Sequence, residues 1–190
     1  MKTSKDSIAL FWFRRDLRLE DNHGLFQALN GDDPVLPVFI FDENILSELE
    51  DKNDKRVAFI HNQLQAVQTL LEEQRSTLYV LHAKPLDVFQ KLLETHEVKH
   101  VFTNRDYEPY ALERDEQVAD LLETKNIPFS TFKDQVIFEK SEVMKADGTP
   151  YTVFTPYSKV WKRNFNPDNF QPIQSENHLD NLLKLEPQKI

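Results

Sequence analysis

The sequence predicts an α/β fold: a doubly wound, five-stranded parallel sheet with helices on both faces. Five short apolar runs alternate with segments whose apolar residues recur at helical spacing, which is the pattern of repeated strand–helix units. The runs, read as strands, are residues 8–13, 35–41, 77–82, 98–103 and 127–132. The first is almost continuously apolar, as is typical of a strand covered on both faces in a parallel sheet. Right-handed crossovers then leave few topologies.

Each predicted helix has a start signal. Asp21 or Asn22 can cap the first helix, which ends in the turn at residues 30–34. Asp54 opens a long helix with one apolar stripe, after a short helical turn at residues 45–49. Pro85 and Pro109 suit the first position of the next two helices, because that position needs no backbone N–H donor.

One residue conflicts with its strand. Pro37 lies inside the second apolar run, and proline cannot donate a hydrogen bond to a neighbouring strand. We therefore expect a bulge or an edge-like position at Pro37, with the strand itself retained.

The chain divides into three parts. Residues 1–133 form the parallel α/β core, and residues 134–163 form trailing loops and a short helix of the same domain. In that helix Thr155 is the expected cap and Pro156 the first helical residue. Residues 164–190 read as the start of an interdomain linker, with one weak helical piece at 179–185. The ending closes no element, so a further domain is expected beyond it.

Composition excludes several classes of function. The 190 residues contain no cysteine, which excludes disulfides and thiol chemistry, and the six histidines show no metal-ligand spacing. A net charge of −9 argues against DNA binding over a broad surface of this chain. With three glycines and no Gly-x-Gly-x-x-Gly, a dinucleotide loop is not expected. No targeting or membrane segment is visible, so a cytoplasmic location is expected.

Three motifs in order carry a resemblance to a known family. They are WFRRDLR at residues 12–18 followed by Asp21-Asn22, NRDYEPY at 104–110 followed by Arg114-Asp115, and VFTPYSK at 153–159 followed by Trp161. Together they resemble the DNA photolyase/cryptochrome family over nearly the whole chain. The resemblance implies a Rossmann-like sheet of order 3-2-1-4-5. It also implies that this is the N-terminal domain, which binds an antenna chromophore.

The implied activity belongs to a larger protein, most like a deoxyribodipyrimidine photolyase. In that family the antenna passes light energy to reduced FAD, which splits a pyrimidine dimer in DNA. FAD and damaged DNA are held by a second, helical domain that is absent here, so this chain alone is expected to be inactive. The alternative is a cryptochrome-type blue-light receptor without repair activity, and a third reading is a stand-alone flavodoxin-like module. Neither a membrane partner nor an oligomer is implied.

The resemblance also implies a site at the carboxyl ends of strands one and four, where the order of the sheet reverses. Asn104 and Glu108 match folate-pterin contacts, and Asp106 and Glu108 match deazaflavin contacts, so a reduced folate or an 8-hydroxy-deazaflavin is the expected cofactor. The expected antenna-binding residues are Arg14, Phe39, Arg56, Asn104, Asp106 and Glu108. No catalytic residue and no metal ligand is expected in this chain.

Structural readings compete at several of these positions. Asp16 can form a salt-bridged brace with the arginines of residues 14–18, and we rank this above a catalytic role. A carboxylate such as Glu108 can instead cap the following helix. Trp12 is expected to be sheet core, and for Phe39 a core role is as good as a ligand role.

Overall fold

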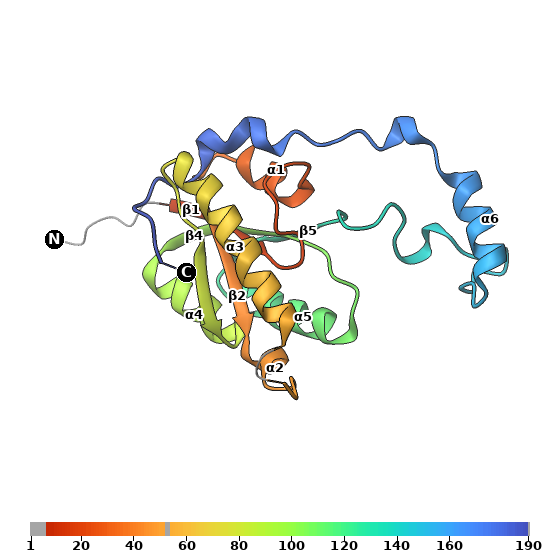
Figure 1. Cartoon of the computed structure of the whole chain (residues 1–190), viewed down its shortest axis with the longest axis horizontal. Helices are drawn as coiled ribbons and strands as arrows, with labels where there is room; N and C mark the ends of the chain where they lie inside the picture. The colour runs from red at the N-terminus through yellow and green to blue at the C-terminus, as the bar shows by residue number, and fades with distance from the viewer. Residues whose placement is uncertain (1–6, 52–53, 190) are drawn as a thin grey trace.

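The computed structural model describes residues 7–51 and 54–189 and has one five-stranded sheet at its centre (Figure 1). The strands pair in parallel in the order β3-β2-β1-β4-β5, which confirms the predicted fold class and order. Their bounds are β1 Ser7–Phe13, β2 Val35–Asp42, β3 Tyr79–Ala83, β4 Glu97–Asn104 and β5 Phe129–Phe132.

Helices cover both faces of the sheet. The side chains of α1 (His23–Leu29) and α3 (Lys55–Glu73) pack in the hydrophobic core on one face. Those of α4 (Pro85–Thr95) and α5 (Pro109–Glu123) pack in a second core on the other face. Successive residues of β1 alternate between the two cores, as strand geometry requires. The apolar run that predicted β1 therefore reflects burial on both sides.

The helix starts follow the predicted signals. Asn22 caps α1 by accepting a hydrogen bond from the Leu25 amide at 3.1 Å, and Asp54 caps α3 from the Arg56 amide at 2.8 Å. Proline occupies the first position of α4 and of α5. The short helix α2 lies at Glu43–Leu46, earlier than the predicted residues 45–49. It begins earlier because the Asp42 side chain accepts from the amide of residue 44 at 3.0 Å and acts as its cap.

Pro37 makes no bulge. It stands opposite Phe11 in an unbroken register between β1 and β2, so that part of the prediction is wrong. On its other side β3 begins to pair with β2 only at Val38, so Pro37 has one neighbouring strand and its missing N–H breaks no ladder. The register shift of the sheet lies instead between Ile8 and Ala9, opposite β4.

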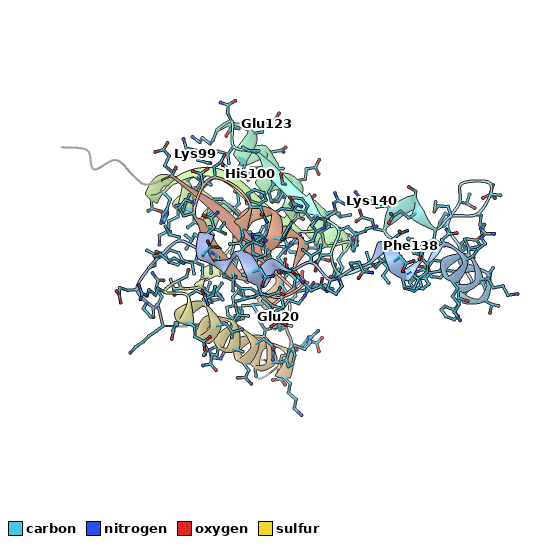
Figure 2. The ribbon with its side chains drawn as sticks, turned by 90° about the horizontal axis from the view of Figure 1, so that it is seen from above. Glu20, Lys99, His100, Glu123, Phe138 and Lys140 are labelled. Carbon is cyan, nitrogen blue, oxygen red and sulfur yellow. The ribbon has the colours of Figure 1, made fainter. Side chains whose placement is uncertain are left out.

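Residues 138–170 form an arm that leaves the body of the domain. Figure 2 shows Phe138 and Lys140 on this arm, away from the sheet, and Figure 1 shows α6 at its far end. The arm contains η1 (Lys140–Glu142), α6 (Phe154–Asn164) and η2 (Pro167–Asn169). Its side chains form a small aromatic cluster of Phe138, Trp161, Phe165 and Phe170.

The start of α6 differs from the prediction. Val153 is the cap, and both Thr155 and Pro156 lie within the first turn. Proline is tolerated there because the first backbone N–H groups of a helix have no partner within the helix.

The end of the chain returns to the body. The helical piece predicted at 179–185 is misplaced: a 3-10 helix, η3, runs over Ser175–Asn181, and an extended stretch follows it. Leu182 is buried, and the Leu183 amide donates to the Val35 carbonyl at 2.8 Å. Further on, the Gln188 amide donates to Thr77 Oγ1 at 3.0 Å. Contacts distant in sequence, which local periodicity does not encode, hold this stretch.

Candidate functional site

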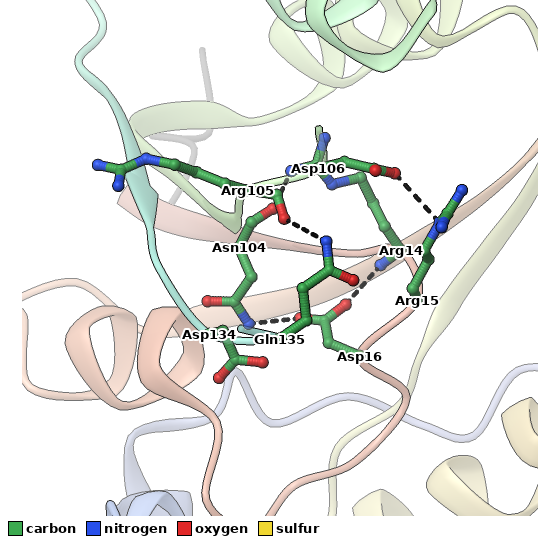
Figure 3. Close-up of a pocket in the computed structure, with 8 residues that line it drawn as sticks. All are labelled: Arg14, Arg15, Asp16, Asn104, Arg105, Asp106, Asp134 and Gln135. Atoms are coloured by element: carbon green, nitrogen blue, oxygen red, sulfur yellow. Dashed lines mark hydrogen bonds and ion pairs between the residues drawn. The ribbon is translucent and has the colours of Figure 1, made fainter. Parts of the chain in front are cut away.

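A buried polar network occupies the carboxyl ends of β1 and β4 (Figure 3). The Asp16 carboxylate accepts hydrogen bonds from the Arg14 amide at 2.8 Å and from Asn104 Nδ2 at 2.6 Å. Asn104 also donates to Asn22 Oδ1 at 2.8 Å and accepts from the Gly24 amide at 2.8 Å. We call Asp16, Asn22 and Asn104 the clamp. These three side chains connect the turn after β1 (residues 14–18, the β1 turn), the end of β4 and the start of α1.

The clamp fills the space between the carboxyl ends of β1 and β4, where the sequence placed the site. The space left there is about 10 Å³, enough for roughly one water molecule. We expected the site at the ends of strands one and four to be open, with Arg14, Asn104, Asp106 and Glu108 along its rim. Directly between β1 and β4 that expectation is wrong. Here Asn104 binds Asp16 and Asn22 instead of lining a cleft, because buried polar groups need hydrogen-bond partners.

The arginines of the β1 turn reach away from Asp16. Each pairs with a carboxylate of another element, so the predicted brace within the turn is wrong. The pairs are Arg14–Asp115, Arg15–Glu108 and Arg18–Asp134, at 2.6, 2.6 and 3.0 Å. Arg14 also donates to the carbonyl oxygen of Asn104. The turn is thereby bound to α5 and to the segment after β5.

Burial sets the electrostatics of this turn. It raises the pKa of the Asp16 carboxyl above its ordinary value, against the opposing hydrogen bonds from Arg14 and Asn104. Burial also lowers the pKa of Arg14, which the neighbouring Asp115 carboxylate opposes. Burying the charged groups of the turn therefore costs free energy, and their hydrogen bonds and ion pairs offset that cost.

The roomy cavity lies beside the clamp, over the carboxyl ends of β1 and β2. Its volume is about 380 Å³, at the small end of the range of ligand pockets. Strand β2, helices α2 and α3 and the connection between those helices supply an apolar wall of Phe39, Ile40, Phe41, Ile45, Leu46, Leu49, Val57 and Ile60. Five of the six expected antenna-binding residues border it, namely Arg14, Phe39, Arg56, Asp106 and Glu108. Asn104 does not, because its side chain is buried in the clamp.

Charged groups mark the rim of the cavity. Glu108 occupies the cap position of α5, but its side chain makes no capping bond and pairs with Arg15 at 2.6 Å. The helix-cap reading of Glu108 is therefore wrong. Asp106 lies 3.3 Å from the same arginine and accepts from the amide of residue 107 at 2.8 Å. Arg56 pairs with Asp54 at 2.6 Å, and its side chain is 76% exposed, which leaves it accessible.

Tyr110 and Arg114 also border the cavity; the second motif contains both, but neither was expected to bind the antenna. The Tyr110 hydroxyl donates to Asp42 Oδ2 at 2.6 Å, and burial together with this bond raises the pKa of the phenol. The Arg114 guanidinium lies 4.8 Å from the centre of the Trp12 ring and 5.8 Å from that of Tyr110. Tyr110 and Arg114 are four residues apart on α5 and so lie on the same face of the helix. This spacing is the feature of the sequence that could have identified them as neighbours.

Comparison with known proteins places this architecture in a family. Residues 9–176 match the family model described as DNA photolyase. The chain belongs to the DNA photolyase family. A deoxyribodipyrimidine photo-lyase from Synechococcus is 34% identical over 158 residues, which are 83% of this chain and 32% of that protein. Cryptochrome-1 of Arabidopsis thaliana is 30% identical over 163 residues, 82% of this chain and 22% of that protein.

Solved structures agree with this assignment. A bacterial class III photolyase from Agrobacterium tumefaciens superposes with a TM-score of 0.76 at 25% identity, covering 87% of this chain and 34% of that one. This photolyase-family chain thus spans about a third of the length of the photolyase relatives named here, and it corresponds to their N-terminal domain region.

The cavity of this photolyase domain suits one class of small molecule. An apolar wall with charged and phenolic groups along its edge fits a planar heteroaromatic ring system bearing polar substituents. Among the described residues no group of three or more His, Asp or Glu side chains could hold a metal ion. In the same part of the chain no helix is long and apolar enough to cross a membrane.

Proposed function

We propose that this chain is the antenna-chromophore-binding domain of a deoxyribodipyrimidine photolyase. The observation that carries the proposal is the convergence of Arg14, Phe39, Arg56, Asp106 and Glu108 on one largely apolar cavity. These residues come from four separate segments of the chain. The family resemblance had implied deazaflavin contacts for Phe39, Arg56, Asp106 and Glu108, and Arg14 was expected beside them. The bound chromophore would supply light absorption, and the protein would hold and orient it.

The side chains divide the work of binding. Phe39 and the apolar wall would cover the faces of the ring, while Asp106 and Glu108 would accept hydrogen bonds from its edge. The accessible guanidinium of Arg56 suits an anionic tail. Of the two candidate chromophores, the 8-hydroxy-deazaflavin is the better supported. The folate contact assigned to Asn104 has no support, because that amide is fully engaged in the clamp.

The remaining assignments concern the larger protein. We propose that FAD and damaged DNA bind a helical domain beyond this chain, with residues 1–133 as the core, 134–163 as its trailing part and 164–190 leading to that domain. The chain alone would then be inactive in repair, and its location would be cytoplasmic. A cryptochrome-type light receptor is the second candidate, supported by the match to cryptochrome-1 of Arabidopsis thaliana.

A ligand titration tests the proposal. The chain is titrated with 8-hydroxy-5-deazariboflavin and with 5,10-methenyltetrahydrofolate, with binding followed by chromophore fluorescence. We expect the deazaflavin to bind and Glu108→Ala to weaken it roughly ten-fold or more, since a hydrogen bond to a charged group is worth about 1.5–3 kcal/mol. Glu116→Ala is the matched control, because Glu116 is an exposed residue of the same helix that does not border the cavity.

The proposal fails if neither chromophore binds. It also fails in its choice of site if a chromophore binds and Glu108→Ala leaves its affinity unchanged. Binding of the folate alone, with the same sensitivity to Glu108, would retain the site and reverse the choice of chromophore.

A further inference from the structure

Trp12 is both a core residue and a wall of the cavity. Its side chain is only 2% exposed and meets the Phe89 ring edge-to-face with ring centres 5.1 Å apart, so the predicted core role is confirmed. The guanidinium carbons of Arg114 and Arg14 lie 4.8 and 5.2 Å from the ring centre. The same side chain borders the 380 Å³ cavity, which the core reading did not anticipate.

The indole N–H of Trp12 has no hydrogen-bond partner among the residues that the structure describes. No described residue accepts a hydrogen bond from the Trp12 ring nitrogen. In residues 7–51 and 54–189, every fully buried side-chain nitrogen or oxygen has a hydrogen-bond partner, so a nitrogen without one is not fully buried. The Trp12 nitrogen is therefore not sealed in the core, and the cavity is the open space that the ring borders. Buried indole N–H groups usually find an acceptor, because leaving one unpaired in apolar surroundings is unfavourable.

A second donor lies beside this one. Arg114 donates through Nε and Nη2 to Asp115 Oδ1 at 3.3 and 3.2 Å. Its Nη1 makes no hydrogen bond with any described residue and has only an ion-pair contact with Asp42 at 4.0 Å. Two donors without hydrogen-bond acceptors at one wall select a ligand edge that carries acceptors. At the rim the protein offers acceptors instead of donors, namely the Asp106 and Glu108 carboxylates.

We propose that the Trp12 indole N–H is a specificity-determining donor for the ligand of this cavity. It binds a carbonyl oxygen or ring nitrogen on the inner edge of a planar heteroaromatic, with Arg114 Nη1 as the neighbouring donor. The protein then recognises the ligand ring at two edges. Acceptors of the ligand face Trp12, and its N–H or hydroxyl donors face the rim carboxylates Asp106 and Glu108. This assignment rests on the proposed function for the nature of the ligand, and it adds the residue that fixes the ring's orientation.

The first test uses lumichrome, a neutral alloxazine with the three fused rings of a flavin and no side chain, and the two indole N–H resonances of the ¹⁵N-labelled chain. Trp12 and Trp161 are the two tryptophans of the sequence. Trp161 packs in the arm against Phe138 and Phe165 and does not border the cavity. We expect lumichrome to shift the Trp12 signal in a saturable way and to leave the Trp161 signal in place.

The second test removes the donor and keeps the ring. In a Trp161→Phe background, Trp12 is replaced during expression by β-(3-benzothienyl)alanine, which has sulfur in place of the indole N–H. Loss of one neutral hydrogen bond should weaken lumichrome binding about five-fold. Trp161→Phe with natural Trp12 should bind like the unmodified chain.

The two proposals fail in different ways. An unmoved Trp12 resonance at saturating lumichrome, or equal affinity in the sulfur analogue, overturns the role of Trp12. Either result leaves the Glu108 titration to decide the antenna function by itself. Conversely, a Trp12 contact with lumichrome alongside failure of both antenna chromophores would retain the donor and refute the proposed function.

Discussion

Replacing Asn104 by alanine should damage the fold far more than it damages ligand binding. The Asn104 amide joins three elements, because it donates to Asp16 at 2.6 Å and to Asn22 at 2.8 Å and accepts from the Gly24 amide at 2.8 Å. The side chain is buried and does not border the cavity. The family resemblance had implied a pterin contact for Asn104, at the end of β4, so the substitution separates the two roles.

The magnitude follows from which partners are left without a hydrogen bond. Asn22 keeps its cap bond to the Leu25 amide, but the buried Gly24 N–H loses its acceptor in Asn104. Asp16 Oδ2 loses its short bond from Asn104 and keeps only the longer one from Asn22 Nδ2 at 3.4 Å. An unsatisfied buried amide costs about 1–3 kcal/mol, and a charged group costs more. We expect a loss of about 3–5 kcal/mol in the free energy of unfolding, a large part of a typical ~5–15 kcal/mol.

The loss of stability caused by Asn104→Ala should depend on pH, because Asn104 binds the titratable Asp16 carboxyl. Burial raises the pKa of this carboxyl, so the folded state favours its protonated form, and that contribution to stability is lost as pH rises through the folded pKa. The hydrogen bond from Asn104 opposes the shift, and its removal raises the folded pKa further. The loss of stability should therefore be smallest near the unfolded pKa of about 3.9 and grow toward neutral pH.

Urea unfolding followed by far-ultraviolet circular dichroism at pH 4.5 and pH 7.5 measures both effects. Asn164→Ala is the control, because Asn164 is an exposed residue at the end of α6. A loss below about 1 kcal/mol in Asn104→Ala, together with abolished deazaflavin or folate binding, would refute the clamp and restore Asn104 as a ligand contact.

Gly24 provides an internal check on the same geometry. A methyl group at Gly24 would lie 2.6 Å from Asn104 Oδ1 and 3.0 Å from the Phe11 ring. Gly24→Ala should therefore destabilise the chain, although alanine is ordinarily the better helix residue. In the Asn104→Ala background the amide is absent, so the added cost of Gly24→Ala should fall, which a double-mutant cycle measures. Strict additivity would contradict the close contact.

Two further predictions concern the edges of the domain. Ser175→Ala should cost about 2–3 kcal/mol in urea unfolding, because the buried hydroxyl donates to the Leu19 carbonyl at 2.6 Å and accepts from the Asn22 amide at 3.0 Å; an unchanged midpoint would show that η3 does not hold the β1 turn. Burial lowers the pKa of His100, so its neutral form stabilises the fold above the unfolded pKa of about 6.5, and this contribution is lost as pH falls through the folded pKa. His100→Gln should accordingly flatten the fall of stability below about pH 6.5, and an unaltered pH profile would contradict this.

The parts of the fold that were predictable depend on short-range signals. Proline at positions 85 and 109 and the cap residues Asn22 and Asp54 start helices through contacts within a few residues. The strands show in the sequence because burial on both faces demands apolar side chains at consecutive positions. The order of the strands, in contrast, came from the family resemblance.

The unpredictable parts depend on partners distant in sequence. Leu182 sits beside Val35 because η3 and the stretch after it run back across the body, and nothing local in residues 171–190 requires this path. The predicted start of α6 was two residues too late, because Thr155 followed by Pro156 is a strong local cap signal. In the structure the cap position is Val153, which makes no side-chain capping bond.

At the site, the sequence predicted which residues gather but not which way each side chain turns. Asn104 and Asp106 are two residues apart at the end of β4, yet Asn104 turns to the clamp and Asp106 to the cavity. The choice depends on the buried Asp16 carboxylate, which needs a donor that only the folded chain supplies.

The position of the cavity follows from this satisfaction of polar groups. At the β1–β4 end the amides and the Asp16 carboxylate bind one another, which removes both the space and the free hydrogen bonds that a ligand would use. Over β1 and β2 the walls are apolar, so no side-chain partnership fills the space. Selectivity in such a cavity can come only from groups that the fold leaves unpaired or exposed. They include the Trp12 N–H and Arg114 Nη1 at the wall and the exposed Glu108 carboxylate at the rim, so the orientation of a bound ring should depend on these three.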